Sequence, residues 1–240
     1  MNKYTDIFID FDDTLYNTRG NAQISLGELF AHYGLERYFP TPEDFYTPYW
    51  ETNLDLWEKY AHGKISRDYL IVERFRRPLA TGRDANGTPM PVTEELCLQM
   101  SDYFLDLCAN KPGVIDGAHE LVKYLTEKGY RLHLCSNGFH EVQYRKLEAC
   151  GMRHAFHNII LSEDAGANKP SPLYFRYAFQ ACGAKPETTI MIGDNPETDI
   201  MGALAAGMDA IFFNPKRKET PVSASVTHEV HTLKEIMEIL

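Results

Sequence analysis

The sequence predicts an α/β fold, a Rossmann-like three-layer core built on a parallel sheet, with an α-helical cap domain inserted into it. From about Asp116 onward, short apolar runs alternate with amphipathic helical stretches, which is typical of a parallel sheet covered on both faces. Between residues 17 and 113, helical periodicity continues without strand-like runs. We therefore expect residues 1–16 and 114–240 to form the α/β core and residues 17–113 to form the helical cap domain.

The core is expected to contain five strands and five helices. The strand-like runs are apolar and partly β-branched: Tyr4 to Ile9, Arg131 to Ser136, Asn158 to Ser162, Thr189 to Gly193 and Asp209 to Phe213. The helical stretches are amphipathic and span 117–128, 139–150, 171–182, 196–206 and 232–240. The opening run has no partner nearby in the sequence, so we expect it to join the sheet as a central strand.

The insertion is expected to be all helical. Its four periodic stretches are Ala22 to Tyr33, Pro42 to His62, Ser66 to Arg77 and Thr93 to Cys108. A loop rich in Gly and Pro runs from Thr81 to Pro91, and Lys111 to Gly113 marks the return to the core. Aromatic residues are dense in this region; they could stack on a flat group such as a base, or simply form the core of the insertion: Tyr38, Phe39, Phe45, Tyr46, Tyr49, Trp50, Trp57 and Tyr60.

Composition limits the classes of partner. The chain has 240 residues, 44% of them hydrophobic and 24% charged, with a formal net charge of −10. That charge opposes a broad surface for nucleic acid or for a membrane, and leaves room for a local cationic pocket that takes a small anion. The five cysteines are scattered and form no Cys-x-x-Cys pair, which indicates reduced, buried thiols. With neither an export signal nor a membrane-length apolar run, we expect a cytoplasmic protein of unknown oligomeric state.

The first predicted strand ends in two carboxylates. Asp10 and Asp12 directly follow an apolar run that is expected to be buried, where uncompensated negative charge is costly. A divalent cation would compensate it. The alternative, for such residues taken alone, is an Asx turn or a helix cap. We expect Asp13, which follows Asp12, to be a local turn residue.

A second polar motif follows the next strand. Ser136, Asn137 and Gly138 offer a hydroxyl, an amide and a flexible backbone where a helix begins, a suitable place for a phosphate. The alternative is a plain turn with a helix cap. Further along, Lys169 is held just before a helix start, where its ammonium could neutralise both a phosphate oxygen and a nucleophilic carboxylate. The alternative there is a solvated surface lysine.

A fourth motif follows the strand that ends at Gly193. Asp194 is delivered to the same edge of the sheet, and a carboxylate there suits Mg²⁺, a hard cation that prefers oxygen ligands. Asp199 lies about one and a half helical turns further on. The alternative for Asp199 is a first-turn acid favoured by the helix dipole. Because ligands bind where parallel strands end, all four motifs are expected to converge on one crevice.

Taken together, these motifs resemble the haloacid dehalogenase superfamily of phosphohydrolases. The resemblance rests on Asp-x-Asp-x-Thr from Asp10 to Thr14, the serine at Ser136, the lysine at Lys169, and Gly-Asp-x-x-x-x-Asp from Gly193 to Asp199. It covers the whole core, and the insertion has the position of the type-one helical cap. The stretches around Ser136, Lys169 and Asp194 look most like the subgroup of pyrimidine 5′-nucleotidases and N-acylneuraminate-9-phosphatases.

The resemblance implies a catalytic core that uses Mg²⁺ and an aspartyl-phosphate intermediate. Asp10 would be the nucleophile and Asp12 the general acid and base. The metal would be bound by the Asp10 carboxylate, the main-chain carbonyl of Asp12 and Asp194, while Thr14 and Asp199 would support the site from behind these ligands. The phosphate would be held by the Ser136 hydroxyl, the N–H groups of Asn137 and Gly138, and Lys169. Haloacid dehalogenases proper lack an acid at the position of Asp12, so this residue favours phosphoryl chemistry.

Several functions remain open at this point. The preferred substrate is a small phosphomonoester, first a pyrimidine nucleoside monophosphate and second a sugar or sialic-acid phosphate. A phosphomutase would share the aspartyl-phosphate, and no residue in the sequence distinguishes it from a phosphatase. A phosphoacceptor signalling module is disfavoured by the large insertion after Asp10. A catalytically silent binding module is disfavoured because no motif residue is lost.

Overall fold

The computed structural model describes residues 3–217, 219 and 226–240. The chain divides into two compact units, which we call the sheet unit, Met1–Thr18 with Pro112–Leu240, and the helical unit, Arg19–Lys111. Each junction lies two residues from the boundary predicted from the sequence, 16/17 or 113/114. Among the described residues, no helix is long and apolar enough to cross a bilayer.

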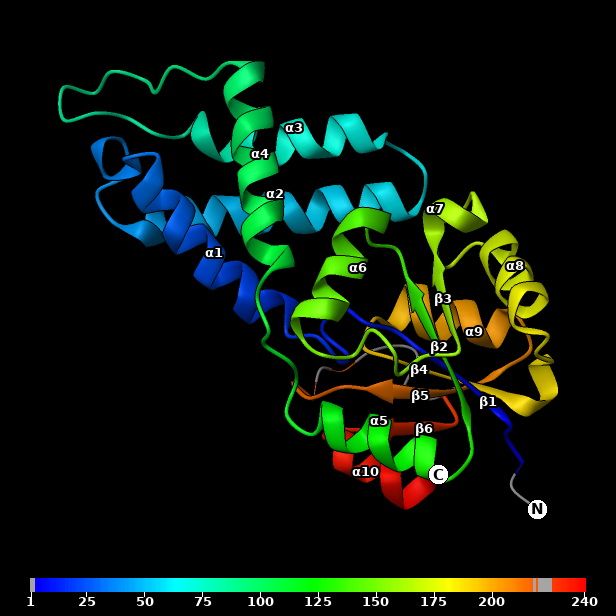
Figure 1. The fold of residues 1–240 in the computed structure, drawn as a ribbon. Helices are drawn as coiled ribbons and strands as arrows, with labels where there is room; N and C mark the ends of the chain where they lie inside the picture. Colours follow the sequence, from blue (N-terminus) through cyan, green and yellow to red (C-terminus); the bar gives the residue numbers. More distant parts are fainter. Residues whose placement is uncertain (1–2, 218, 220–225) are drawn as a thin grey trace. The chain divides into compact units, whose positions relative to one another are not determined.

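Six parallel strands form the sheet of the described chain, in the order β3-β2-β1-β4-β5-β6 (Figure 1). Their bounds are β1 Asp6–Ile9, β2 Arg131–Ser136, β3 Asn158–Leu161, β4 Thr189–Gly193, β5 Asp209–Phe213 and β6 His228–Val230. The opening strand β1 lies between β2 and β4, with Asp6 opposite Arg131 and Thr189, so the prediction of a central strand is confirmed. The carboxyl ends of β1, β2 and β4 therefore meet at one edge of the sheet.

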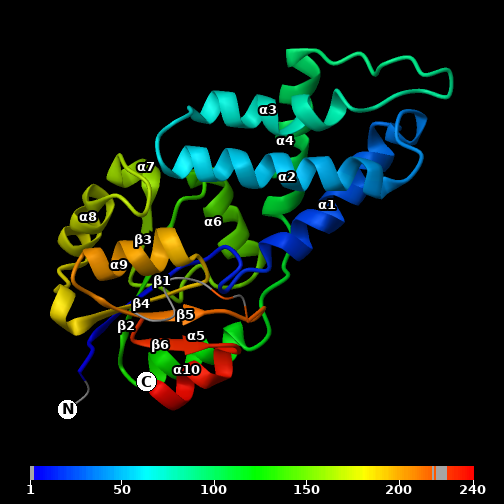
Figure 2. The same ribbon diagram turned by 180° about the vertical axis from the view of Figure 1, so that it is seen from behind.

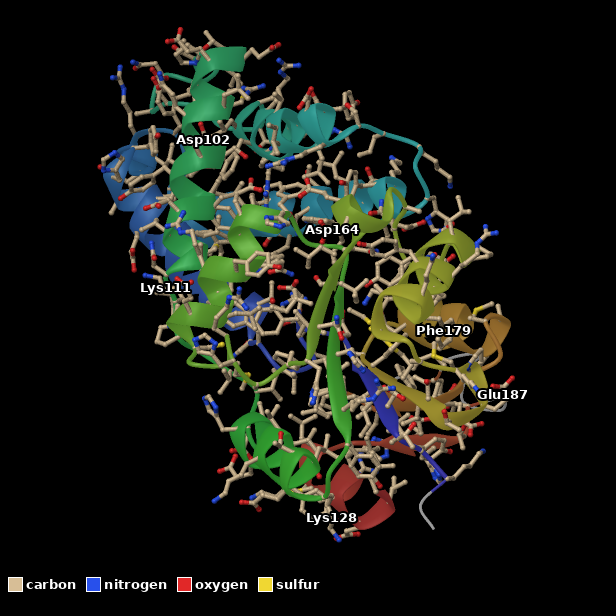
Figure 3. The ribbon with its side chains drawn as sticks, turned by 45° about the vertical axis from the view of Figure 1, so that its right-hand side comes forward. Asp102, Lys111, Lys128, Asp164, Phe179 and Glu187 are labelled. Carbon is tan, nitrogen blue, oxygen red and sulfur yellow. The ribbon has the colours of Figure 1, made fainter. Side chains whose placement is uncertain are left out.

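Helices cover both faces of this sheet (Figures 1 and 2). They are α5 Ala118–Glu127, α6 His140–Ala149, α7 Ser162–Ala165, α8 Pro172–Cys182, α9 Gly202–Ala205 and α10 Leu233–Ile239. Because side chains alternate along a strand, Ile7 and Ile9 pack in one cluster with α5 and α10, while Phe8 packs in the other with α8. Phe179 of α8, labelled in Figure 3, has its ring centroid 5.4 Å from that of Phe8. The predicted three-layer α/β architecture is confirmed.

Three local features differ from the prediction. The strand β6 and the one-turn helix α7 were not expected, because a few residues are too short to show a period. The predicted helix 196–206 begins instead as a π-helix, Pro196–Met201, followed by α9. Its wide turn begins at Asn195, whose carbonyl accepts from the N–H of both Asp199 and Ile200, and whose side chain accepts from two further N–H groups. Such π turns often occur at functional sites.

The helical unit is built from four helices, α1 Thr18–His32, α2 Pro42–Ala61, α3 Arg67–Leu79 and α4 Glu94–Ala109, where α1 starts one residue before the unit boundary. Side-chain oxygens of Ser66 and Thr93 cap α3 and α4 by accepting from backbone N–H groups. Six of the eight aromatic residues singled out above belong to its hydrophobic core or pack against it: Tyr38, Phe39, Phe45, Tyr46, Tyr49 and Trp50. For these six, the interpretation as core is confirmed. Trp57 and Tyr60 instead form an edge-to-face pair with centroids 5.6 Å apart.

A buried carboxylate, Asp6, pairs with a partly exposed arginine at the opposite end of the strands, where β1 and β2 begin. The Asp6 carboxylate is 1% exposed and accepts hydrogen bonds from Arg131 Nη2 at 2.8 Å and from the His133 ring nitrogen Nε2 at 2.9 Å. Burial raises the pKa of Asp6, but the hydrogen bonds from Arg131 and His133 outweigh it and the pKa is lowered. Asp6 therefore helps to hold β1 and β2 in register at their amino-terminal ends.

We expect Asp6→Ala to lower the free energy of unfolding by about 2–4 kcal/mol at pH 7, because Arg131 and His133 lose their acceptor. A carboxylate with a lowered folded-state pKa stabilises the fold above its unfolded pKa of about 4, and this contribution disappears as the pH falls through the folded value. In urea unfolding, the difference in free energy of unfolding between the wild type and Asp6→Ala should therefore become smaller below about pH 4. Exposed Glu187 (Figure 3) provides the control, since Glu187→Ala should change stability by less than about 0.5 kcal/mol. If the stability difference between Asp6→Ala and the wild type stays constant with pH, the ionised Asp6 carboxylate does not stabilise the fold as described.

Candidate active site

The central strand β1 delivers Asp10 to the edge where the carboxyl ends of the strands meet. Its backbone N–H donates to the carbonyl of Ile192 on β4 at 2.9 Å, which continues the ladder by one residue and fixes where the side chain emerges. Only 7% of Asp10 is exposed. The chain then turns at Asp13, which has a φ of 63° and donates its N–H to the carbonyl of Tyr16, as expected for a turn residue.

A buried ammonium lies against this carboxylate. Lys169 is 1% exposed, and its Nζ donates to Asp10 Oδ1, to Asp199 Oδ1 and to the Cys135 carbonyl, each at 2.7 Å. Burial lowers the pKa of Lys169, but the two carboxylates outweigh burial and raise it, so the lysine stays charged. The alternative of a solvated surface lysine is wrong, because all three donors of this ammonium are used inside the protein.

Asp199 is held behind Asp10 by the π-helical turn. Its Oδ1 accepts from Lys169, and its Oδ2 accepts from the N–H of Asn195 at 3.1 Å. Asp199 approaches the backbone so closely that a Cβ at position 193 would collide with its carboxylate, which explains the glycine there. Both oxygens of Asp199 are thus occupied by protein donors, as expected of a residue that orients the others.

Negative charge accumulates around Asp194. Carboxylate oxygens of Asp10, Asp194 and Asp199 all lie within 4.8 Å of one another. Burial and the neighbouring carboxylates Asp10, Asp199 and Asp13 raise the pKa of Asp194 well above its usual value. Burial, opposed by Lys169 and reinforced by Asp199, raises the pKa of Asp10 to about 7. The ammonium of Lys169 does not neutralise this cluster fully.

The site fits the predicted metal. Three close carboxylates, of which Asp10 and Asp194 have raised pKa values, are the oxygen donor set that a hard divalent cation such as Mg²⁺ prefers, and a cation would relieve their repulsion. Because both oxygens of Asp199 already accept protein hydrogen bonds, Asp10 and Asp194 are the better ligands. Thr14 supports both of them, donating to Asp10 Oδ2 at 3.0 Å and lying 3.4 Å from Asp194 Oδ1. The role of the Asp12 main-chain carbonyl stays a prediction.

The loop after β2 makes contacts that the sequence did not reveal. The Asn137 side chain donates to the Lys169 carbonyl at 2.9 Å and accepts from the Lys169 N–H at 2.8 Å, so it fixes the backbone that carries the lysine. The Gly138 N–H donates to Ser136 Oγ at 3.0 Å. A phosphate held by Gly138, as predicted, would have to take over this hydrogen bond from Ser136.

Asp12 has different partners from Asp10. Its Oδ1 accepts from Lys146 Nζ at 2.6 Å and from Thr18 Oγ1 at 2.5 Å, and its Oδ2 accepts from Gln143 Nε2. Ser136 Oγ lies 3.5 Å from Asp12 Oδ2. Burial raises the pKa of Asp12, but Lys146 and the other hydrogen bonds outweigh it and lower the pKa. Two carboxylates two residues apart in the chain thus have pKa values moved in opposite directions.

Four of these contact residues were missed from the sequence: Thr18, Asn195, Gln143 and Lys146. A signal did exist for the last two. Gln143 and Lys146 are one turn apart in the predicted helix 139–150 and share its buried face with Val142 and Leu147. Polar residues on an apolar helix face require buried partners.

The fold and the site together define a class of α/β enzyme, with a buried carboxylate at the end of its central strand, a lysine beside it and acidic residues able to hold a cation. The model of the haloacid dehalogenase-like hydrolase family matches residues 7–207. The chain belongs to this family, which confirms the resemblance drawn from the four motifs.

The chain matches known relatives over its whole length or over part of it. It is 31% identical over 242 residues to the protein named HAD-hydrolase YfnB of Bacillus subtilis, covering 100% of this chain and 97% of that one. It is 28% identical to the pyrimidine 5′-nucleotidase PynA of Streptococcus pneumoniae, covering 99% and 95%. Human N-acylneuraminate-9-phosphatase is 34% identical over 110 residues, 45% of this chain and 44% of that one.

A solved structure of one of these relatives is similar to this chain over the full length of both. A crystal structure of YfnB bound to magnesium superimposes with a TM-score of 0.85 at 28% identity, covering 100% of this chain and 99% of that one. With named phosphatases and nucleotidases among its relatives, the chain is a phosphoric monoester hydrolase of this family.

We expect Asp194→Asn to stabilise the metal-free protein at pH 8, because it removes one charge from a repelling cluster. A carboxyl group whose folded-state pKa is raised is ionised more readily when unfolded, so wild-type stability should fall between about pH 4 and pH 7 and stay low above it. In excess chelator, thermal unfolding at pH 8 should show a higher Tm for the variant, by about 2–4 °C for each kcal/mol relieved.

Added Mg²⁺ should reverse this order by raising the Tm of the wild type more than that of Asp194→Asn. Glu187→Gln, at an exposed position, serves as the control and should follow the wild type in both buffers. An unchanged metal response in Asp194→Asn would count against Asp194 as a ligand.

Proposed function

We propose that this chain is a Mg²⁺-dependent phosphatase that hydrolyses a small phosphomonoester through an aspartyl-phosphate on Asp10, with pyrimidine nucleoside 5′-monophosphates as the first choice of substrate. The observation that carries the proposal is the buried contact between Asp10 and Lys169 at 2.7 Å, next to a carboxylate cluster suited to a cation. We also propose that residues 17–113 act as the cap and that the enzyme works in the cytoplasm, where its five buried cysteines stay as free thiols.

The nucleophile must be an ionised carboxylate that can approach a dianion. Its pKa of about 7 leaves Asp10 partly protonated without a cation. Magnesium, when held by Asp10, Asp194 and the Asp12 carbonyl, supplies positive charge that favours ionised Asp10 and offsets the charge of the phosphate. Lys169 is already in contact with Asp10 and provides a second, permanent positive charge.

The reaction then takes two displacements. An Asp10 oxygen attacks phosphorus, the bond from phosphorus to the leaving oxygen breaks, and Asp12 gives that oxygen its proton. In the second step, the Asp12 carboxylate takes a proton from water, whose oxygen attacks phosphorus. The bond from phosphorus to the Asp10 oxygen breaks, which releases inorganic phosphate and restores the Asp10 carboxylate. The lowered pKa of Asp12 suits the second step directly, and the negative charge of an arriving phosphate raises that pKa for the first.

The remaining residues hold the transferred phosphate. Ser136 Oγ, the N–H groups of Asn137 and Gly138, and Lys169 lie on the two loops that Asn137 ties together. Donors that are fixed before the substrate arrives need no reorganisation as charge develops on the phosphate oxygens. This fixed loop geometry is what we expect to raise the rate, since phosphoryl transfer depends mainly on positioning and electrostatics.

The choice of substrate rests on the relatives. The pyrimidine 5′-nucleotidase PynA matches 99% of this chain, including the helical unit, whereas the N-acylneuraminate-9-phosphatase match covers 45%. Specificity that resides in the cap would follow the longer match. A sugar or sialic-acid phosphate is the second choice, and a phosphomutase is a further alternative with the same intermediate.

We expect Asp10→Asn and Asp12→Ala to lose nearly all phosphate release from p-nitrophenyl phosphate in Mg²⁺, since the first lacks the nucleophile and the second lacks the base, a role worth about 10²–10⁴ in rate. Exposed Asp102 on α4 (Figure 3) provides the matched control, and Asp102→Asn should keep the wild-type rate. Wild-type rates in either catalytic variant, or full wild-type activity after dialysis into chelator, would refute the mechanism.

A panel of phosphomonoesters tests the substrate. We expect kcat/KM to be highest for pyrimidine nucleoside 5′-monophosphates, at least about tenfold above purine nucleotides and sugar phosphates, a discrimination of about 1.4 kcal/mol. Phosphate release should equal substrate loss. A preference for a sugar or sialic-acid phosphate would move the assignment to the second choice, and sugar-phosphate isomers without free phosphate would indicate a mutase.

A further inference from the structure

Two polar side chains of α6 lie beneath Asp12. Gln143 is 0% and Lys146 is 7% exposed, and they are one helical turn apart on a face otherwise formed by Val142 and Leu147. Both point their polar ends to the same carboxylate. A buried ammonium and a buried amide are costly in such a place unless their partners hold them.

Lys146 and Gln143 bond different oxygens of the Asp12 carboxylate. Lys146 Nζ donates to Asp12 Oδ1 at 2.6 Å, and Gln143 Nε2 donates to Asp12 Oδ2, so each oxygen has its own donor from α6. Thr18 Oγ1 also donates to Oδ1, at 2.5 Å. With both oxygens fixed, the carboxylate can neither rotate about its own axis nor turn away without breaking an ion pair.

The backbone around the site leaves room for this arrangement. A Cβ at Gly138 would overlap the amide of Gln143, and Gly138 does not have a positive φ. The glycine in the Asn137-Gly138 motif is therefore explained by the space that Gln143 occupies. Lys146 is also fixed from the side, with its Nζ 5.1 Å from the centroid of the Tyr16 ring.

We propose that Lys146 and Gln143 are positioning residues that hold the Asp12 carboxyl toward the leaving oxygen of the substrate, an inference that rests on the proposed function. An apolar pair of similar volume would pack this helix face at least as well. The polar pair is expected where one carboxyl orientation must be kept, because proton transfer to a leaving group requires the acid within hydrogen-bond reach of it.

The role predicts a dependence on the leaving group. Phenyl phosphate releases a phenol with a pKa of about 10, like that of tyrosine, and needs protonation as the bond breaks. The p-nitrophenolate ion is a much weaker base and needs little help. Since kcat/KM covers the steps up to release of the leaving group, a misplaced Asp12 should lower kcat/KM for phenyl phosphate far more than for p-nitrophenyl phosphate.

The test compares these two substrates in purified variants with Mg²⁺. Lys146→Met keeps an unbranched side chain one atom shorter and removes the charge. It should lower kcat/KM about 30-fold for phenyl phosphate and less than about threefold for p-nitrophenyl phosphate, a partial loss of the roughly 10²–10⁴-fold that general acid catalysis contributes. Lys146→Arg should recover the phenyl phosphate value to within about threefold. Gln143→Leu should show the same selectivity in weaker form, and it serves as the second variant if Lys146→Met does not fold.

Two references separate the possible outcomes. Lys123→Met, on the exposed face of α5, is the matched control and should follow the wild type on both substrates. Asp12→Ala gives the selectivity expected for complete loss of the acid. Equal losses on both substrates in Lys146→Met and Gln143→Leu, beside a selective loss in Asp12→Ala, would overturn the positioning role alone. No hydrolysis by the wild type would overturn the proposed function, and this inference with it.

Discussion

The site depends on one buried ammonium. Lys169 donates to Asp10, to Asp199 and to the carbonyl of Cys135, and thereby joins the ends of β1 and β2 with the π-helical turn after β4. Without it, two carboxylates would be buried next to each other with no positive charge in contact, which proteins avoid at a cost of several kcal/mol. Two neighbouring residues support this contact. The Asn137 side chain hydrogen-bonds both the carbonyl and the N–H of Lys169, and Gly193 leaves space for Asp199.

A second ammonium gives the two motif aspartates different chemistry. Burial raises the pKa of Asp10, Lys169 opposes the rise and the Asp199 carboxylate adds to it. Burial also raises the pKa of Asp12, but Lys146, Thr18 and Gln143 outweigh burial and lower it. Two carboxyl groups whose environments separate their pKa values are the usual basis for different roles in one reaction. The separation arises from α6 on one side and from the loop before α8 on the other.

The sequence predicts those parts of the molecule that depend on pattern or on strand ends. Apolar runs locate β1, β2 and β4, and the convergence of parallel strands then brings Asp10, Ser136 and Asp194 to one edge. Contacts chosen by tertiary packing are not predictable in this way. A helical lysine such as Lys146 is by default a surface residue, and only the packing of α6 within the sheet unit reveals its partner. The π turn at Asn195 and the three residues of β6 leave no periodic signal.

The same reasoning explains why the chemistry can be inferred more readily than the substrate. Charged residues inside a protein must be compensated, so each buried carboxylate or ammonium of the sheet unit identifies its partners and limits what it can do. Aromatic residues are under no such constraint. In the helical unit, Phe39, Phe45 and Tyr49 are buried in the core of that unit. Their density in the sequence would equally suit a surface on which a nucleotide base stacks. A reaction class therefore follows from electrostatics within one unit, whereas a preference for one leaving group depends on shape and stacking, for which the sequence carries a weaker signal.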